Sequence, residues 1–337
     1  MRWSCWLLLQ ANLLAGGDFV GSAACGECHA DHVRRQSSTN HALALRPILE
    51  TGLPILLSER PVRERGGAQL EYRRVEHGLL VAATRSGAHA EGLLEWAFGA
   101  GSQGVTPVGL LGSLYFEHRI SYYTAPKRLS LTMGHPGGPS RDAAAALGLP
   151  QEASTIQRCF SCHGTNVQPG PDLSRMEAGV RCERCHGPGR DHIVAAREKR
   201  PTADIIHTLL NPGRYPAKAA VQICGECHRA PAERKISATP EIDDPISVRF
   251  QPVGFLASKC FLGSKNFSCM TCHDPHENSR RNDDTFFSAK CAGCHQTNPK
   301  ASSHCHRQTK RNCLPCHMQR LSPVSYLMFT DHRIRIY

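Results

Sequence analysis

The sequence is poor in the side chains that normally fill a protein interior, because only 6% of its 337 residues are aromatic. A chain of this length could form two ordinary domains, and such domains would draw more of their cores from aromatic residues. Cysteine and histidine are instead abundant, with 17 and 19 copies. We therefore expect something other than side chains to fill part of the interior. Disulfides, zinc and haem are the usual substitutes in cysteine-rich chains.

Long apolar runs are also missing, since no segment approaches the 18 apolar residues of a membrane-spanning helix. The amino terminus has one short apolar stretch, residues 5–14, which follows Arg2 and precedes the small residues 15–17. This pattern predicts a cleaved export signal peptide over residues 1–17, with a misassigned start or a buried first helix as the alternatives. We expect a protein that does not span a membrane and is periplasmic or extracellular.

Seven copies of Cys-x-x-Cys-His account for most of the cysteines. They are Cys25, Cys28 and His29; Cys159, Cys162 and His163; Cys182, Cys185 and His186; Cys224, Cys227 and His228; Cys269, Cys272 and His273; Cys291, Cys294 and His295; and Cys313, Cys316 and His317. Two thiols at this spacing can add to the two vinyl groups of one porphyrin, and the adjacent imidazole then meets the iron. The motifs predict seven covalently bound haem c groups, with these histidines as proximal ligands.

A zinc ribbon is the strongest alternative, because 19 residues separate Cys162 from Cys182. A ribbon has no need of a histidine directly after each cysteine pair, yet one follows all seven pairs. The formal charge of +11 would also fit nucleic acid. Seven ferric haems with ionised propionates reduce that charge to roughly +4, and export argues against such a partner. We therefore expect haem and no nucleic acid.

Motif spacing indicates how the chain is organised. Six motifs lie in the last 180 residues, where neighbours are as few as 22 residues apart, so the porphyrins must pack closely. The first motif is remote, and the chain can fold back to place it beside the others. The segments expected are the leader 1–17, a first haem-binding segment 18–60, a β-rich insertion 61–135 and a six-haem cluster domain 136–337.

The gap after the first motif contains strand-like runs at 69–75, 78–84, 93–98 and 114–123, with turns at His77-Gly78 and Ser86-Gly87. These runs predict a small antiparallel sheet. The fold class expected for the whole chain is mainly α, with much irregular structure wrapped round a haem array and a small antiparallel β segment inserted after the first haem motif.

The twelve histidines outside the motifs are candidates for the second axial position. His192 and His276 closely follow the third and fifth motifs, so neither easily reaches the far side of its own porphyrin, and each is expected to ligate a neighbouring haem. His135 follows a loop glycine and can reach an iron. His118 lies on the apolar face of a strand, where a core histidine and a ligand are equally consistent with the pattern.

Two cysteines, Cys260 and Cys305, belong to no motif. A disulfide between them and two separate buried thiols both fit the sequence.

Several segments resemble the exported multihaem cytochromes related to the tetrahaem cytochrome of ammonia oxidation, the cytochrome c-554 and c-prime type. They are residues 38–42, FGAGSQG (98–104), HRISYY (118–123), GVRCERCHGPGRDH (179–192), CMTCHDPH (269–276), CLPCHM (313–318) and FTDHRIR (329–335). The resemblance implies electron transfer, and it implies His41, His192, His276 and His332 as distal ligands. The TPR repeats that many relatives carry are missing from this sequence, so a docking role for such repeats is not implied.

These patterns favour an electron carrier whose haems conduct between redox proteins or further cytochrome subunits, including copies of the chain in a homo-oligomer or filament. The alternative is a multihaem oxidoreductase that acts on a small nitrogen or sulfur compound at one open haem. The Cys-x-x-Cys-Lys variant of the familiar multihaem nitrite reductases does not occur in the sequence. No catalytic residue is assigned.

Overall fold

The computed structural model describes residues 18–59, 61–64, 67–229, 244–295 and 312–336. The expected leader and Cys305 lie outside these residues. The chain divides into two compact units, Met1–Leu210 and Asn211–Tyr337. The segments expected from the motif spacing stay predictions, because this division rests on contacts between residues. Those segments are 18–60, 61–135 and 136–337.

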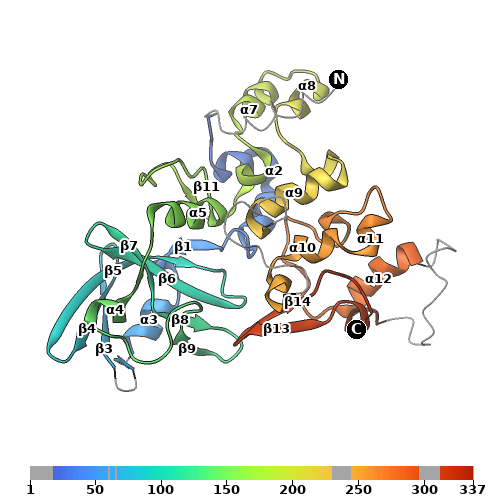
Figure 1. Cartoon of the computed structure of the whole chain (residues 1–337). Helices are drawn as coiled ribbons and strands as arrows, with labels where there is room; N and C mark the ends of the chain where they lie inside the picture. Colours follow the sequence, from blue (N-terminus) through green and yellow to red (C-terminus); the bar gives the residue numbers. More distant parts are fainter. Residues whose placement is uncertain (1–17, 60, 65–66, 230–243, 296–311, 337) are drawn as a thin grey trace, which may run out of the picture. The chain divides into compact units, whose positions relative to one another are not determined.

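The first unit is built on a ten-stranded antiparallel sheet (Figure 1). Its strands are β1 (Leu45–Pro47), β2 (Val62–Arg63), β3 (Gln69–Val75), β4 (Gly78–Arg85), β5 (Ala88–Phe98), β6 (Gly104–Leu111), β7 (Leu114–His118), β8 (Ile120–Tyr123), β9 (Arg128–Leu131) and β10 (Gly148–Pro150). The main order is β10-β7-β6-β5-β4-β3-β2, while β1 pairs with β5, and β8 pairs with β6 and β9. Positive φ angles at Ser86 and Gly87 allow the tight turn between β4 and β5.

One face of this sheet supplies the core of the first unit. Leu70, Leu79, Val81, Leu94 and Phe116 are almost completely buried in one apolar cluster. The cluster is covered by η1 (Ile48–Glu50), α3 (Leu53–Ser58) and α4 (Ala143–Leu147), which lie beside the sheet in Figure 1. Apolar side chains therefore fill the interior here.

The expected fold class, mainly α with a small β segment, is wrong. The sheet runs from Leu45 to Pro150 and exceeds the expected insertion at both ends. The outlying strands β1 and β10 are three residues long and contain proline, so they carry no alternation that sequence could reveal. They are strands because each pairs with a strand of the sheet that is distant in sequence or separated by a helix, β1 with β5 and β10 with β7.

The other elements of the first unit carry or support the first three motifs. They are α2 (Ser22–Ser37), α5 (Ala153–His163), β11 (Gly164–Thr165), β12 (Glu177–Ala178), α6 (Cys182–His186), α7 (Arg190–Arg197) and α8 (Thr202–His207). None of the helices in the described part of the chain combines the length and apolar composition needed to cross a membrane.

The second unit consists of short helices and one hairpin. Its elements are η2 (Pro212–Arg214), α9 (Ala217–His228), η4 (Pro245–Arg249), α10 (Gln251–Leu256), α11 (Lys259–Leu262), η5 (Cys269–Thr271), α12 (Asp284–His295), α13 (Leu314–His317), β13 (Arg320–Val324) and β14 (Leu327–Thr330). Val253 and Phe255 of α10 are buried, and the Phe255 ring lies 5.1 Å from that of Phe267. Four of the seven motifs lie on these helices.

Candidate haem sites

All seven motifs lie on helical turns. Helices α5, α6, α9, α12 and α13 each end at the histidine of a motif. The first motif lies within α2, which kinks at His29, and in the fifth the His273 amide donates to the Cys269 carbonyl at 3.0 Å. A helical turn places side chains three residues apart on one face. The two thiols of each motif can therefore meet one porphyrin edge.

Protein oxygens hold the Nδ1 atoms of several candidate ligands. His163 Nδ1 lies 3.0 Å from the Ala44 carbonyl oxygen, and His186 Nδ1 lies 2.8 Å from that of Leu210. A ring nitrogen that donates to a carbonyl fixes the tautomer and leaves Nε2 with a lone pair for a metal. These contacts would therefore orient the two imidazoles for iron binding.

His29 of the first motif faces His192 of α7. The two ring centroids are 6.3 Å apart with an interplanar angle of 26°. An imidazole–metal bond is about 2 Å and the ring centroid lies about 1 Å further back, so two axial imidazoles on one iron have centroids about 6 Å apart. His192 Nδ1 lies 3.1 Å from the Ile205 carbonyl oxygen, which leaves Nε2 for the iron. The pair has the spacing that a six-coordinate haem requires.

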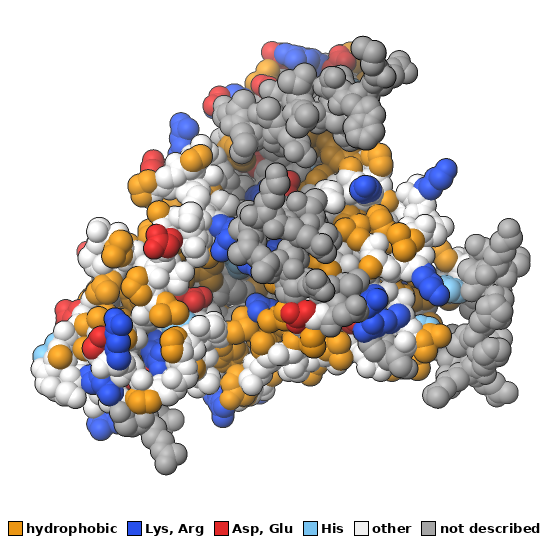
Figure 2. Space-filling view, in the orientation of Figure 1, with side chains coloured by type: hydrophobic (Ala, Val, Ile, Leu, Met, Phe, Trp, Pro, Cys, Tyr) orange, Lys and Arg blue, Asp and Glu red, His pale blue; other side chains and the backbone are white. Residues whose placement is uncertain are grey.

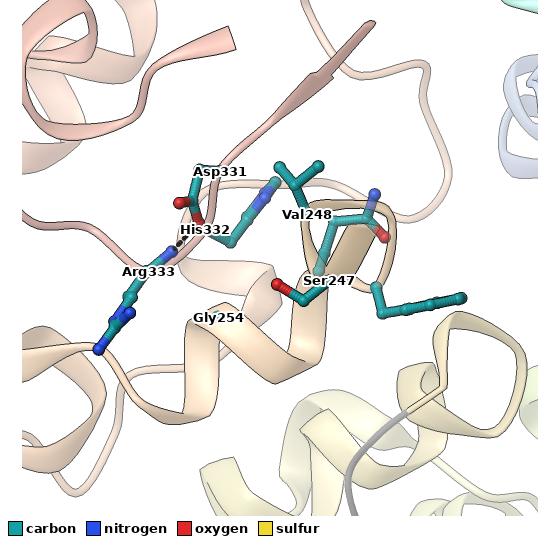
Figure 3. Close-up of a pocket in the computed structure, with 8 residues that line it drawn as sticks. Ser247, Val248, Gly254, Asp331, His332 and Arg333 are labelled. Atoms are coloured by element: carbon teal, nitrogen blue, oxygen red, sulfur yellow. Dashed lines mark hydrogen bonds between the residues drawn. The ribbon is translucent and has the colours of Figure 1, made fainter. Parts of the chain in front are cut away.

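A second pair with the same spacing occurs in the other unit. The ring centroids of His273 and His332 are 6.2 Å apart. His332 Nδ1 lies 2.9 Å from the Thr330 carbonyl oxygen, and burial lowers the pKa of His332 to about 4, so its ring is neutral near pH 7. Figure 3 shows His332 between Asp331 and Arg333, with Ser247 and Val248 among the residues that line the adjacent pocket. The residues present therefore fit a haem with two histidine ligands.

Two glutamates bring the first motif beside the third. Glu183 lies inside the third motif, and its carboxylate accepts from the amides of Val20 at 3.0 Å, Gly21 at 2.8 Å and Gly189 at 2.7 Å. Glu177 accepts from the Ser22 amide at 3.3 Å at the start of α2. Carboxylates are favourable at a helix N-terminus, where amides lack partners within the helix. These contacts join segments more than 150 residues apart, so the remote first motif does fold back onto the third.

Cysteines of different motifs lie within hydrogen-bonding reach of one another. The contacts join Cys25 to Cys182, Cys224 to Cys269, and Cys291 to Cys313. The motifs are thus adjacent as first with third, fourth with fifth, and sixth with seventh. Porphyrins attached at these cysteines would lie close together.

The second motif is seated on the sheet by an aromatic cluster. Phe160, which follows Cys159, is fully buried, and its ring centroid lies 5.7 Å from that of Trp96 and 5.8 Å from that of Tyr115. The Phe98 ring also contacts His163, at 5.2 Å. The sheet therefore supports the second motif through the face opposite its main core.

The other histidines considered as distal ligands have different surroundings. His118 is completely buried, with Nε2 at 2.8 Å from the Tyr72 hydroxyl and Nδ1 at 2.6 Å from the Leu147 carbonyl oxygen. Both ring nitrogens have protein partners, which favours the core-histidine alternative.

His135 is buried, with Nε2 at 3.2 Å from a Glu117 carboxylate oxygen. His276 is half-buried, with Nδ1 at 3.1 Å from Asp274, and His41 is exposed. The role of these three histidines as ligands stays a prediction.

Cys260 is half-buried, and its pKa is raised by burial. Its predicted relation to Cys305 involves a residue outside those described. Within the described ranges, no group of three or more His, Cys, Asp or Glu side chains is placed to hold a metal ion by itself.

Sequence reasoning missed two residues that position the motifs. Glu183 occupies a variable position between the motif cysteines, where no local pattern indicates that it will cap a distant helix. Gln251 lies 23 residues after His228 and has its Oε1 atom 3.1 Å from His228 Nδ1. Both contacts depend on tertiary folding, and no spacing rule could have revealed them.

Comparisons with known proteins agree with this picture. Residues 138–187, which contain the second and third motifs, match the family described as cytochrome c554 and c-prime. The fold is similar to the crystal structure of the outer cell wall cytochrome OcwA, with a TM-score of 0.52, 15% sequence identity, and 94% of this chain and 79% of that chain covered. No curated protein sequence matches the chain. The predicted resemblance is confirmed: the family match supports haem c and a role in electron transfer, and the structural likeness shows the fold.

Proposed function

We propose that this chain is an exported c-type cytochrome that binds seven covalent haems and passes electrons along them between redox partners. The observation that carries the proposal is the spacing of the pairs His29–His192 and His273–His332, whose centroids lie 6.3 and 6.2 Å apart. Each pair joins a motif histidine to one from another part of the chain, which is what ligation of a haem by two histidines needs. Bound haem iron supplies the one-electron chemistry.

The protein's own residues perform three tasks in this proposal. The motif cysteines on helical turns anchor the porphyrins, and the carbonyl-held imidazoles approach the irons from fixed directions. Contacts between motifs, such as that of Cys25 with Cys182, keep neighbouring haems close enough for electron transfer. Glu183 secures this first contact by capping α2.

We propose redox proteins or further cytochrome subunits, including copies of this chain, as the partners. On the face shown in Figure 2, Lys and Arg are scattered and form no single patch. Charge on this face therefore does not select a strongly acidic partner. Export to the periplasm or cell exterior is supported by the leader-like sequence at 1–17 and by the cell wall location in the name of OcwA.

Intact-mass analysis of the natively exported protein, combined with haem quantification, tests the proposal. Seven covalent haems per chain and low-spin spectra in both redox states are expected. Absence of haem adducts would refute it. A stoichiometric high-spin signal that shifts with nitrite or hydroxylamine would instead favour the oxidoreductase alternative.

A further inference from the structure

The ring of His228, in the fourth motif, is held differently from its counterparts. Backbone carbonyls lie next to Nδ1 in His163, His186 and His332, whereas His228 Nδ1 lies 3.1 Å from the side-chain Oε1 of Gln251. Iron binding through Nε2 requires a proton on Nδ1, so the Gln251 amide oxygen must be the acceptor. A side-chain acceptor can be exchanged by mutation without altering the backbone.

Helix α10 gives Gln251 a fixed place. The three residues after it, Pro252, Val253 and Gly254, are buried, and α10 packs against α9, the helix that carries His228. A Cβ atom added at Gly254 would lie 2.8 Å from the Arg333 amide nitrogen, so the helix is in close contact with the segment that carries His332. These contacts hold the backbone at Gln251 in place beside α9.

We infer that Gln251 is a positioning residue that sets the reduction potential of the haem at the fourth motif. The inference rests on the function proposed above. An acceptor at Nδ1 increases electron donation from the imidazole to the iron and stabilises the ferric state. A stronger acceptor lowers the potential of this haem, and a missing acceptor raises it.

The test is spectroelectrochemical titration of the fully haem-loaded protein and of two variants, Gln251→Glu and Gln251→Met. Gln251→Glu is expected to favour the ferric form of one haem about tenfold, a downward shift of about 59 mV for a one-electron couple. Gln251→Met is expected to shift the same haem upward and to leave the other potentials unchanged. Opposite shifts of the reduction potential in the two variants distinguish an effect of the hydrogen bond from a packing defect. A packing defect would shift the potential in the same direction in both variants.

Gln222→Glu provides the matched control, because it places the same charge on α9, two residues before Cys224. If the potential shifts less in Gln222→Glu than in Gln251→Glu, Gln251 acts through its hydrogen bond. An equal shift in the two variants would overturn the inference, because the added charge alone would then explain it. Unchanged potentials in both Gln251 variants overturn it as well. Wild-type protein without haem would refute the proposed function, whereas a fully loaded protein insensitive to Gln251 would refute only this inference.

Discussion

Replacing His192 with alanine should leave one iron without its second axial ligand. The His192 ring is the partner of His29 at 6.3 Å, and its Nδ1 atom is oriented by the carbonyl of Ile205 at 3.1 Å. The variant should therefore convert one haem of the seven, about 14% of the total, from low-spin to high-spin iron. The other six should keep their spectra, because His29 is the proximal histidine beside which His192 lies in the described part of the chain.

Quantitative electron paramagnetic resonance of the oxidised protein measures this change. His32→Ala is a demanding control, since the His32 ring centroid is also 6.3 Å from that of His29. Its ring is inclined at 63° and lies three residues further along the same helix, so it cannot reach the opposite side of an iron held by His29. The control should remain low-spin.

The reasoning fails if His192→Ala shows no high-spin iron while retaining seven haems. It fails equally if His32→Ala gives the high-spin signal and His192→Ala does not. Imidazole added to the His192→Ala protein should restore the low-spin signal, which distinguishes a lost ligand from general misfolding.

Three other perturbations have defined outcomes. Acid should destabilise the sheet, because burial lowers the pKa of His118 to about 4 in the folded protein, against 6.5 in the unfolded chain. The unfolded chain therefore binds the proton more readily, and the free energy of unfolding decreases by up to about 3 kcal/mol as the pH falls from 6.5 to 4. Denaturant unfolding at both pH values should show this loss in the wild type and not in His118→Gln, and equal losses would count against it. Gly254→Ala should displace the His332 segment, because the new Cβ would lie 2.8 Å from the Arg333 amide nitrogen, and should yield one high-spin haem; an unaltered spectrum would contradict this. Glu183→Ala should release the start of α2, because it removes the acceptor of the half-buried Val20 and Gly21 amides. Faster proteolysis near residue 20 is the expected readout.

The candidate site was largely predictable because covalent chemistry imposes a spacing on the sequence. The motif histidines and the proposal that His192 serves a neighbouring haem followed from residue order alone. The structure places the His192 ring beside that of His29 in the first motif, and the role of His192 as a ligand there stays a prediction. The role of His118 as a ligand or a core histidine could not be predicted from the sequence. An alternating strand places a histidine on an apolar face, but it does not show whether Tyr72 and Leu147 will form hydrogen bonds with its ring nitrogens.

Less of the fold could be predicted from the sequence, and the strands show why. The strand predicted over residues 69–75 has the same limits in the structure, because Leu70 and Tyr72 alternate with exposed charged residues. The expected strand 114–123 is instead broken at Arg119, whose side chain turns inward to Glu64 and to the carbonyl oxygens of Pro136 and Gly138. Such a break depends on partners distant in sequence, which no local periodicity encodes.

The contact of Glu183 with Val20 closes a loop of 163 positions that contains the entire ten-stranded sheet. Chain closure over such a separation is entropically costly until the intervening segment is compact. The first motif is synthesised before all the others, yet its contact with the third becomes less costly once the sheet is compact. We therefore expect an ordered assembly of the first unit, in which a sheet that carries no motif of its own determines when the earliest motif reaches its final neighbours.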